Sequence, residues 1–417
     1  MTKTHSGTQS AIVHALGWMA FANLVGVWMS LLLLWPSLGQ MTQELTYGKW
    51  NSVHLNAHLY GWCSLPLIAF LFGVFKIEQN PLKKHARVFV WLWTLALAVG
   101  CISWLMGNSS GKIFLDWKGF PLFLFVGTLS ALWLYLSAIT WINRHESKLW
   151  WRVVTLAVLL PVPFLIWFAA DPSVYPPVNP DTGGPTGSSL LGSSLSIIIL
   201  MLFSPTVIGW KKRDSSKRLQ ITCWCVLALQ IALLLTMKQG ASSHHEMEQF
   251  LGLGSLLLWF PLMPLYMRLW TWSVGMQRWM LASCAWLGLL ILTGWMSFLP
   301  GWLDKMQFTN GLVAHSHLAM AGFVTSFLML LSGESLSKPC RKGLTASLPF
   351  FSWHIAVGIY LIAMWWSSYL EAANPGYIVA QSSPVLLPYL VRSCCGIVML
   401  IVSFTWWRGL LPSLSHE

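Results

Sequence analysis

Long apolar runs alternate with short polar segments along the whole chain. Each run is about 20 residues long, the length at which an α-helix crosses a hydrocarbon core of about 30 Å. The pattern predicts an all-α integral membrane protein with twelve transmembrane helices in a single domain, residues 1–417. The predicted spans are residues 11–38, 50–75, 87–107, 119–142, 150–169, 186–210, 218–237, 248–268, 279–299, 309–333, 346–370 and 384–407.

Composition and charge support a membrane protein and predict its orientation. Hydrophobic residues make up 56% of the chain and charged residues 9%. Lys and Arg gather in alternate loops, which places these loops and both termini on the cytoplasmic side of a bacterial-type inner membrane. The formal net charge of +12 is therefore a topology signal, and nothing indicates nucleic-acid binding. The basic loops are residues 76–87, 143–152, 209–218, 268–278 and 337–342.

Several patterns that would indicate another class of protein are not found. The first apolar run is longer than a signal-peptide core, so we expect it to be retained as a span. The eight cysteines form no CxxC or zinc-type array and are expected to pack within the spans. The sequence shows no CxxCH motif for an attached haem, no evident internal repeat and no soluble second domain.

Five histidines fall near the outer face of the predicted bundle. His54 begins the second span, His244 and His245 follow the seventh, and His315 and His317 lie in the first third of the tenth. Ionisable groups inside a membrane are costly and mark functional sites by default. Because three distant parts of the chain bring histidine to one depth, we expect these residues to converge on a site.

Imidazole is a common ligand of haem iron and copper. His315 and His317 are two residues apart, so on an α-helix their side chains diverge by about 200° and do not easily share one metal. They can reach two cofactors on opposite sides of the helix. The adjacent His244 and His245 suit a small metal if the helix is irregular there, but the same stretch with Glu246 also reads as a polar helix start.

These motifs together resemble the catalytic subunit I of haem-copper oxidases, most closely the cbb3 type, over nearly all twelve spans. The similar segments are "YGKWNSVHLNAHLYGW", "ASSHHEMEQFLG", "GLVAHSHLAMAGF", "WHIAVGIYLIAMWW" and "LPYLVRSCCG". The resemblance implies two haems, expected to be b-type. It makes His54 and His317 the axial ligands of a low-spin haem, His315 the proximal ligand of a high-spin haem, and His244 and His245 ligands of copper or a second metal.

Three positions depart from the family pattern. Ser188 stands at the third copper ligand, where a hydroxyl oxygen is a weaker ligand than imidazole. Lys238 stands at the redox-active tyrosine, so no catalytic residue is assigned. Pro300 stands at an acidic position near the outer end of the ninth span, with Glu246 and Asp304 nearby. The resemblance therefore implies complete haem sites and leaves copper open.

Three further residues are weighed against these ligands. His58 is one turn beyond His54 and is a rival axial ligand or a hydrogen-bond partner. His354 has no counterpart in the family and is expected to be structural. Arg392 starts the last span near the outer face, where it would contact a haem propionate or, alternatively, pair with Glu371 or a lipid phosphate.

The resemblance predicts a divergent subunit I of a respiratory terminal oxidase or reductase. Electrons would pass from a low-spin to a high-spin haem, where oxygen or nitric oxide would be reduced. Since the chain has no CxxCH motif, a cytochrome c or copper protein would donate electrons, beside other respiratory subunits. The alternatives are a haem protein for electron transfer, sensing or haem handling without reductase activity, and a transporter with a histidine proton relay.

Overall fold

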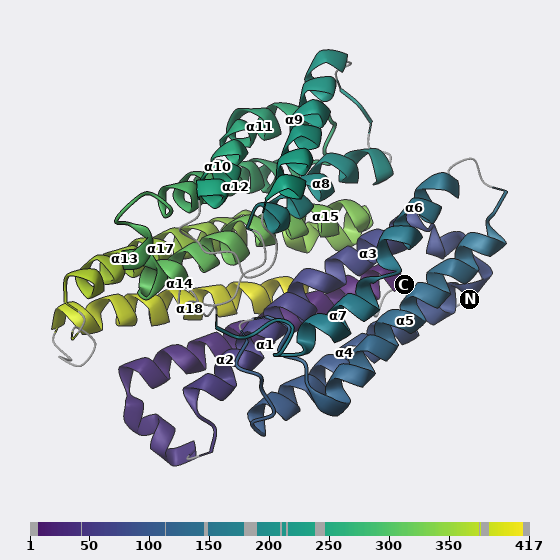
Figure 1. Ribbon diagram of the computed structural model, residues 1–417. Helices are drawn as coiled ribbons and strands as arrows, with labels where there is room; N and C mark the ends of the chain where they lie inside the picture. The colour runs from purple at the N-terminus through teal and green to yellow at the C-terminus, as the bar shows by residue number, and fades with distance from the viewer. Residues whose placement is uncertain are drawn as a thin grey trace. The chain divides into compact units, whose positions relative to one another are not determined.

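The computed structural model describes residues 7–42, 44–112, 114–145, 149–178, 190–208, 211–213, 216–237, 247–374, 376 and 383–411. The regular secondary structure of these residues is helical, and their isolated bridges include an antiparallel one between Lys212 and Trp270. The predicted all-α fold is confirmed (Figure 1).

Eleven helical segments of the described chain are long and apolar enough to cross a membrane. Each overlaps a predicted span, and the one remaining predicted span, residues 186–210, contains α8 (Leu190–Ile208), whose apolar part, Leu191–Thr206, is shorter. The chain is therefore a multi-pass membrane protein. The eleven segments are Gly7–Leu34, Tyr47–Val74, Pro81–Leu105, Gly119–Ile142, Leu149–Ala170, Lys217–Thr236, Met247–Met267, Gln277–Met296, Asn310–Ser335, Ser347–Ala373 and Val385–Leu410.

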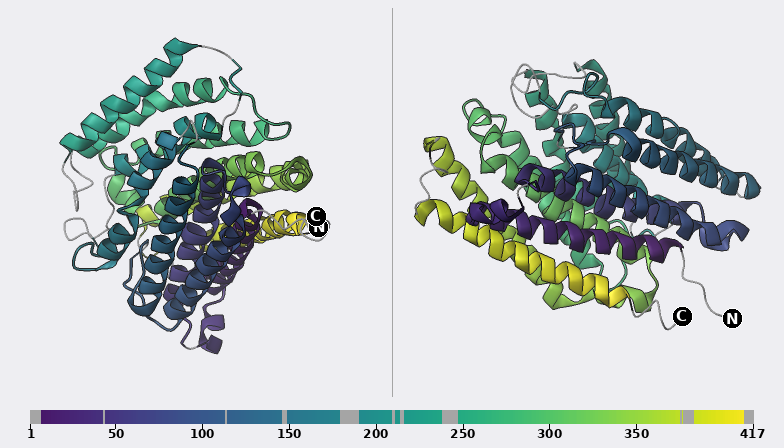
Figure 2. Two further views of the ribbon diagram at one scale, coloured as in Figure 1. Left: turned by 90° about the vertical axis from the view of Figure 1, so that its right-hand side faces the viewer. Right: turned by 90° about the horizontal axis from the view of Figure 1, so that it is seen from below.

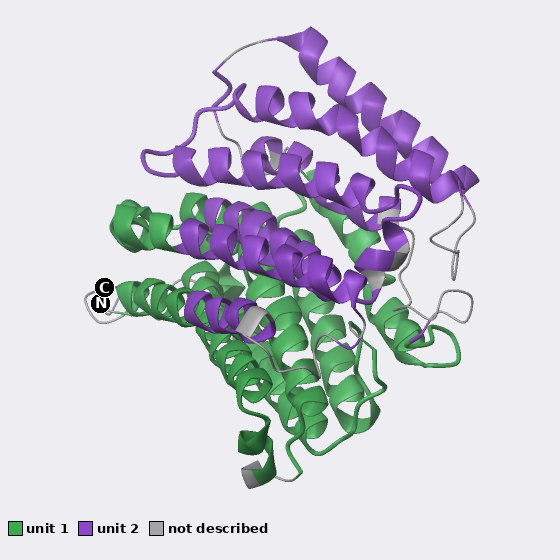
Figure 3. Ribbon diagram, turned by 90° about the vertical axis from the view of Figure 1, so that its left-hand side faces the viewer, with its two compact units in different colours: residues 1–177, 331–352, 396–417 green, residues 178–330, 353–395 purple. Residues whose placement is uncertain are grey.

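The described helices fall into two compact units, shown in different colours in Figure 3. Unit 1 comprises residues 1–177, 331–352 and 396–417, and unit 2 comprises residues 178–330 and 353–395. The helices of unit 1 are α1 (Gly7–Leu34), η1 (Pro36–Thr42), α2 (Tyr47–Asn56), η2 (Ala57–Cys63), α3 (Ser64–Val74), η3 (Ile77–Gln79), η4 (Pro81–Lys84), α4 (His85–Leu105), α5 (Gly119–Ile142), α6 (Leu149–Leu159), α7 (Val162–Ala170), α16 (Lys338–Arg341) and η7 (Lys342–Thr345).

Unit 2 holds most of the second half of the chain. Its helices are α8, α9 (Lys217–Thr236), α10 (Met247–Ser255), η5 (Leu256–Leu258), α11 (Trp259–Met267), α12 (Gln277–Met296), α13 (Leu303–Gln307), α14 (Asn310–His317) and η6 (Leu318–Val324). Three helices have residues in both units, namely α15 (Thr325–Ser335), α17 (Ser347–Ala373) and α18 (Ser383–Leu410).

Helix α4 illustrates how the apolar sequence is used. Trp93 and Leu97 are buried, whereas Trp91 and Leu95 are 62% and 53% exposed. Large apolar side chains on the outside of a bundle are the arrangement that lipid tails stabilise, since a helix that is apolar all round suits a membrane span. The outer apolar face is thus the lipid-facing surface of the span.

Proline divides one predicted span. Residues of the span 150–169 form two helices, α6 and α7, and Pro161 immediately precedes the second. Proline has no backbone N–H and fits the start of a helix better than its interior. The break therefore follows from the sequence.

In unit 1, α1 packs against α2, η2, α3 and α4. The last part of α18 also lies against α1, where a Cβ at Gly17 would be 3.2 Å from the indole nitrogen of Trp407. The start of α1 and the end of α18 lie at the same end of this unit (Figure 2). In unit 2, α12 packs against α10, α11, α14 and η6.

Candidate functional site

His54 lies on α2, close to the backbone of α1. Its Nδ1 is 2.8 Å from the carbonyl oxygen of Ala22. A carbonyl only accepts hydrogen bonds, so Nδ1 donates and carries the proton. In the neutral ring this puts the lone pair on Nε2, and histidine ligands usually donate their other N–H in this way. The structure thus gives His54 the tautomer of an Nε2 ligand.

A glycine of α1 makes room for the His54 ring. A Cβ added at Gly26 would lie only 2.7 Å from Cε1 of His54. The His58 ring is 4.8 Å from the His54 ring and nearly perpendicular to it. Both rings are half-buried. The bond to the Ala22 carbonyl orients the His54 imidazole.

His317 lies at the end of α14 and has the same tautomer as His54. Its Nδ1 is 2.8 Å from the carbonyl oxygen of Val313, one turn earlier on the same helix. The ring also stacks on Tyr360 of α17, with centroids 4.4 Å apart. The hydroxyl oxygen of Tyr360 is 3.5 Å from Nδ1 of His317. Two contacts therefore orient this imidazole.

His315 lies against α12. A Cβ at Gly294 would be 3.1 Å from Cε1 of His315 and 3.6 Å from its Nε2. The ring is half-buried. A glycine thus makes space for this imidazole, as Gly26 does for His54. The tautomers and the two glycine cradles fit the axial ligation of haem that the resemblance implies.

Arg392 contacts the Tyr360 ring, which also stacks on His317. Its guanidinium carbon is 5.9 Å from the ring centroid. The alternative partner Glu371 directs its carboxylate elsewhere, to the backbone N–H and the side-chain amide of Asn310. Arginine over an aromatic face is a favourable cation–π arrangement. The Tyr360 ring thus contacts both His317 and Arg392.

The start of α14 is held by a buried polar cluster. Oε2 of Glu371 accepts the backbone N–H of Asn310 at 2.7 Å, and Ser367 donates to Oε1 at 3.1 Å. The Asn310 amide also donates to Tyr389 at 3.1 Å. The Thr309 side chain caps the helix by accepting from the backbone of residue 311. A carboxylate at a helix N-terminus is stabilised by the free N–H groups there.

His354 differs from the candidate ligands. The indole N–H of Trp286 donates to its Nδ1 at 2.9 Å. Indole is only a donor, so Nδ1 is the acceptor and, in the neutral ring, the proton lies on Nε2. Neither nitrogen then offers a lone pair to a metal. This agrees with the expectation that His354 is structural.

The predicted copper side lies outside the described residues. Ser188, Lys238, His244, His245 and Glu246 all belong to it. Within the described chain, no three His, Cys, Asp or Glu side chains come together in a metal-binding group. Pro300 is exposed between α12 and α13, and α13 carries Asp304, whose side chain is not described.

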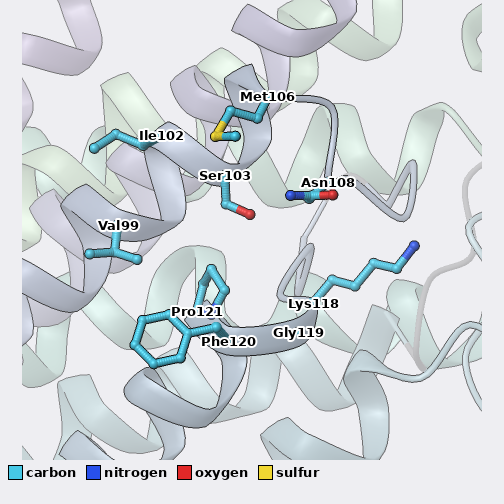
Figure 4. Close-up of a pocket in the computed structure, with 9 residues that line it drawn as sticks. All are labelled: Val99, Ile102, Ser103, Met106, Asn108, Lys118, Gly119, Phe120 and Pro121. Atoms are coloured by element: carbon cyan, nitrogen blue, oxygen red, sulfur yellow. The ribbon is translucent and has the colours of Figure 1, made fainter.

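One pocket of unit 1 lies away from the candidate histidines. It is formed by the end of α4 and the start of α5, with Ser103, Asn108 and Lys118 as its polar residues (Figure 4). The loop between α4 and α5 is bonded to the end of α7 by Lys112, whose amine donates to the carbonyls of Ala169 and Ala170 at 2.6 and 2.9 Å. Burial lowers the pKa of the Lys112 amine. The loop is a structural connection between helices.

Likeness to known proteins is found at the level of structure. No protein-family model matches the sequence, and no curated protein matches it. The chain is similar to a solved structure described as a cryo-EM structure of a heme-copper terminal oxidase dimer, with a TM-score of 0.46 and 12% identity. The match covers 99% of this chain and 85% of the other. At that TM-score the likeness does not assign a function, a cofactor or a subtype.

Sequence reasoning missed three residues that shape the site. Tyr360 stacks on His317, and Gly26 and Gly294 make room for the other two rings. Tyr360 follows the histidine motif by more than 40 residues, and a lone glycine in an apolar helix has many explanations. Only the helix packing relates these residues to the histidines.

Proposed function

We propose that the chain is a haem-binding electron-transfer protein of the membrane, a divergent subunit I of a respiratory oxidase or reductase. His54 and His317 are axial ligands of a low-spin haem, and His315 is the proximal ligand of a second haem. The observation that carries the proposal is the tautomer of His54 and His317. Each donates Nδ1–H to a backbone carbonyl at 2.8 Å.

The contrast with His354 supports this reading. Three buried or half-buried histidines in spans have described tautomers, and only the two at predicted ligand positions present a lone pair on Nε2. If the histidines merely filled space, the tautomer would be set by whichever neighbour was present. A histidine proton relay would not require backbone carbonyls to fix one tautomer on both rings.

The chain's own residues bind and orient the cofactor in this proposal. A haem supplies one-electron transfer when bound. The carbonyl partners of His54 and His317 keep their rings in place and raise the basicity of Nε2. Arg392 provides a positive charge for a propionate, and the Tyr360 ring holds it near His317. Electrons would come from a cytochrome c or a copper protein.

A haem protein without reductase activity is the second candidate. It is favoured by the sequence at the second metal site, where Ser188 and Lys238 replace the expected histidine and tyrosine. His244 and His245 remain as ligands for a second metal. The two candidates differ in metal content and turnover. An oxidase or reductase needs the second metal, whereas electron transfer, sensing or haem handling does not.

The test is a reduced-minus-oxidised spectrum of the purified protein, with pyridine-haem quantitation and iron and copper analysis. We expect two haems per chain. His54→Ala and His317→Ala should each remove the low-spin signal, while His354→Ala should retain it. A wild-type protein without haem would refute the proposal. Two haems without copper, and without turnover of oxygen or nitric oxide, would favour the second candidate.

A further inference from the structure

Two π-helical turns interrupt the spans that carry the candidate ligands. They are η2 (Ala57–Cys63) and η6 (Leu318–Val324), each seven residues long. The first begins three residues after His54, and the second begins three residues after His315. π-helical turns are rare and frequently occur at functional sites. The two turns therefore have the same placement relative to a candidate ligand.

A tryptophan N–H from another helix donates to the same position of each turn. Trp93 of α4 donates to the carbonyl of Tyr60 at 2.7 Å, and Trp353 of α17 donates to the carbonyl of Ala321 at 2.9 Å. Each acceptor is six residues after its histidine. A π turn redirects backbone carbonyls, and in a membrane such groups need a partner from the protein.

A hydroxyl closes each turn in the same way. Ser64 directly follows η2 and donates to the carbonyl of Leu59 at 2.9 Å. Thr325 directly follows η6 and donates to the carbonyl of Met320 at 2.8 Å. In both cases the donor is ten residues after the histidine and the acceptor is five residues before the donor. The two turns thus use equivalent side chains for equivalent bonds.

Each turn also contains a glycine against a tryptophan of the neighbouring helix. Gly61 and Gly322 both lie seven residues after their histidine. A Cβ at Gly61 would be 2.5 Å from Cβ of Trp18 on α1, and one at Gly322 would be 3.0 Å from Cδ2 of Trp286 on α12. Only glycine allows these helices to approach so closely.

The neighbouring helices repeat the pattern. Gly26 follows Trp18 on α1 by eight residues, and Gly294 follows Trp286 on α12 by eight residues. These are the glycines that make room for the rings of His54 and His315. One set of contacts lies wholly in unit 1 and the other wholly in unit 2. The likeness therefore does not depend on how the units are placed.

We infer that the two helix pairs are copies of one histidine-positioning module, in which Trp93 and Trp353 fix the π turns and thereby orient His54 and His315. Neither tryptophan touches the reacting atoms, so both are positioning residues. The inference rests on the proposed function for the cofactor. The repeat was not evident in the sequence because "HLNAHLYGWCS" and "HSHLAMAGFVT" share only their histidine and glycine as identical residues.

The experiment replaces each indole by a ring that cannot donate. Trp93→Phe and Trp353→Phe remove the N–H and keep an aromatic side chain. Trp133→Phe is the matched control, because Trp133 of α5 donates to the carbonyl of Leu156 in α6 at 2.9 Å, and neither residue belongs to a module. Haem content, electron paramagnetic resonance spectra, midpoint potentials and melting temperature are measured on the protein as purified.

We expect Trp93→Phe to shift the low-spin signal and potential, and Trp353→Phe to shift those of the high-spin haem, with haem affinity lowered by about tenfold. Trp133→Phe should lower the melting temperature alone. Spectra and potentials unchanged in both module variants would overturn the inference, even if they melt earlier. Ser64→Ala and Thr325→Val provide the same readouts if a tryptophan variant does not fold.

The outcome separates the inference from the proposed function. A wild-type protein that lacks both haem signals refutes the proposed function and the inference with it. A wild-type protein with both signals, whose module variants match Trp133→Phe in every spectrum, refutes the inference alone. A spectral shift restricted to the module variants supports both.

Discussion

A methyl group at Gly26 provides a direct test of how His54 is oriented. The new Cβ would lie 2.7 Å from Cε1 of His54, whereas ordinary contact begins at 3.4 Å, so the ring would have to retreat by about 0.7 Å. Its bond to the Ala22 carbonyl is 2.8 Å long. The same retreat along this bond would stretch it to about 3.5 Å, beyond the useful range.

The loss of this bond has a calculable effect on haem binding. One hydrogen bond contributes about 0.5–1.5 kcal/mol net, which corresponds to roughly 2- to 13-fold in affinity. Loss of ring orientation adds to this, since partners of metal-bound histidines are typically worth about 10- to 100-fold. We therefore expect Gly26→Ala to weaken low-spin haem binding by about tenfold or more, and to leave the high-spin signal in place.

Gly294→Ala should have the opposite selectivity and a smaller effect. Its Cβ would lie 3.1 Å from Cε1 of His315, so a retreat of about 0.3 Å restores contact. Gly127→Ala and Gly358→Ala are the controls, because a Cβ at either position meets nothing within 4 Å. The assay is haem titration of the apoprotein, followed by absorption and electron paramagnetic resonance spectra. An unchanged low-spin signal in Gly26→Ala would refute the reasoning.

Three further predictions concern the surroundings of the histidines and the loop after α7. Glu371→Ala should lower the free energy of unfolding by about 1–3 kcal/mol, because it leaves buried donors of α14 without an acceptor. Melting in detergent measures this loss, and an effect no larger than that of Glu44→Ala, a substitution at an exposed position, would contradict the prediction. Tyr360→Ala should shift the low-spin spectrum more than Tyr360→Phe, because phenylalanine keeps a ring stacked on His317. Equal shifts in the two variants would contradict the role of the ring. The exposed Asp171 carboxyl accepts hydrogen bonds from the side chain and the backbone of Ser173, and these bonds lower its pKa. Their stabilisation is therefore present above the ordinary pKa of 3.8 and is lost as the pH falls through the pKa of the folded state. The difference in melting temperature between wild type and S173A should shrink on acidification, and a constant difference would contradict this.

The spans were predictable because the hydrophobic pattern is continuous and each run has the length of a membrane crossing. The break before α7 follows from Pro161, and the cap of α14 follows from Thr309. Both effects depend on residues that are adjacent in the sequence. Local physics therefore defined which segments are helical and where several of them begin.

The π turns could not be predicted in the same way. Their stabilising donors, Trp93 and Trp353, come from other helices and lie almost 40 residues after the histidines. The glycines at 61 and 322 are two among 32 in the chain. Their meaning depends on the tryptophan that each one meets, which only tertiary packing determines.

The two modules differ at one position, and the difference bears on how many axial ligands they supply. Two residues after the first histidine, the module that contains His315 (module 2) has His317, and the module that contains His54 (module 1) has Asn56. Both side chains donate to the carbonyl four residues earlier at 2.8 Å, so their placement is equivalent. Asn56 is fully buried, and its Oδ1 has no hydrogen-bond partner among the described residues. An amide at this position leaves module 1 with one proposed axial ligand, His54, and module 2 with two, His315 and His317, which is the number that one bis-histidine haem and one mono-histidine haem require.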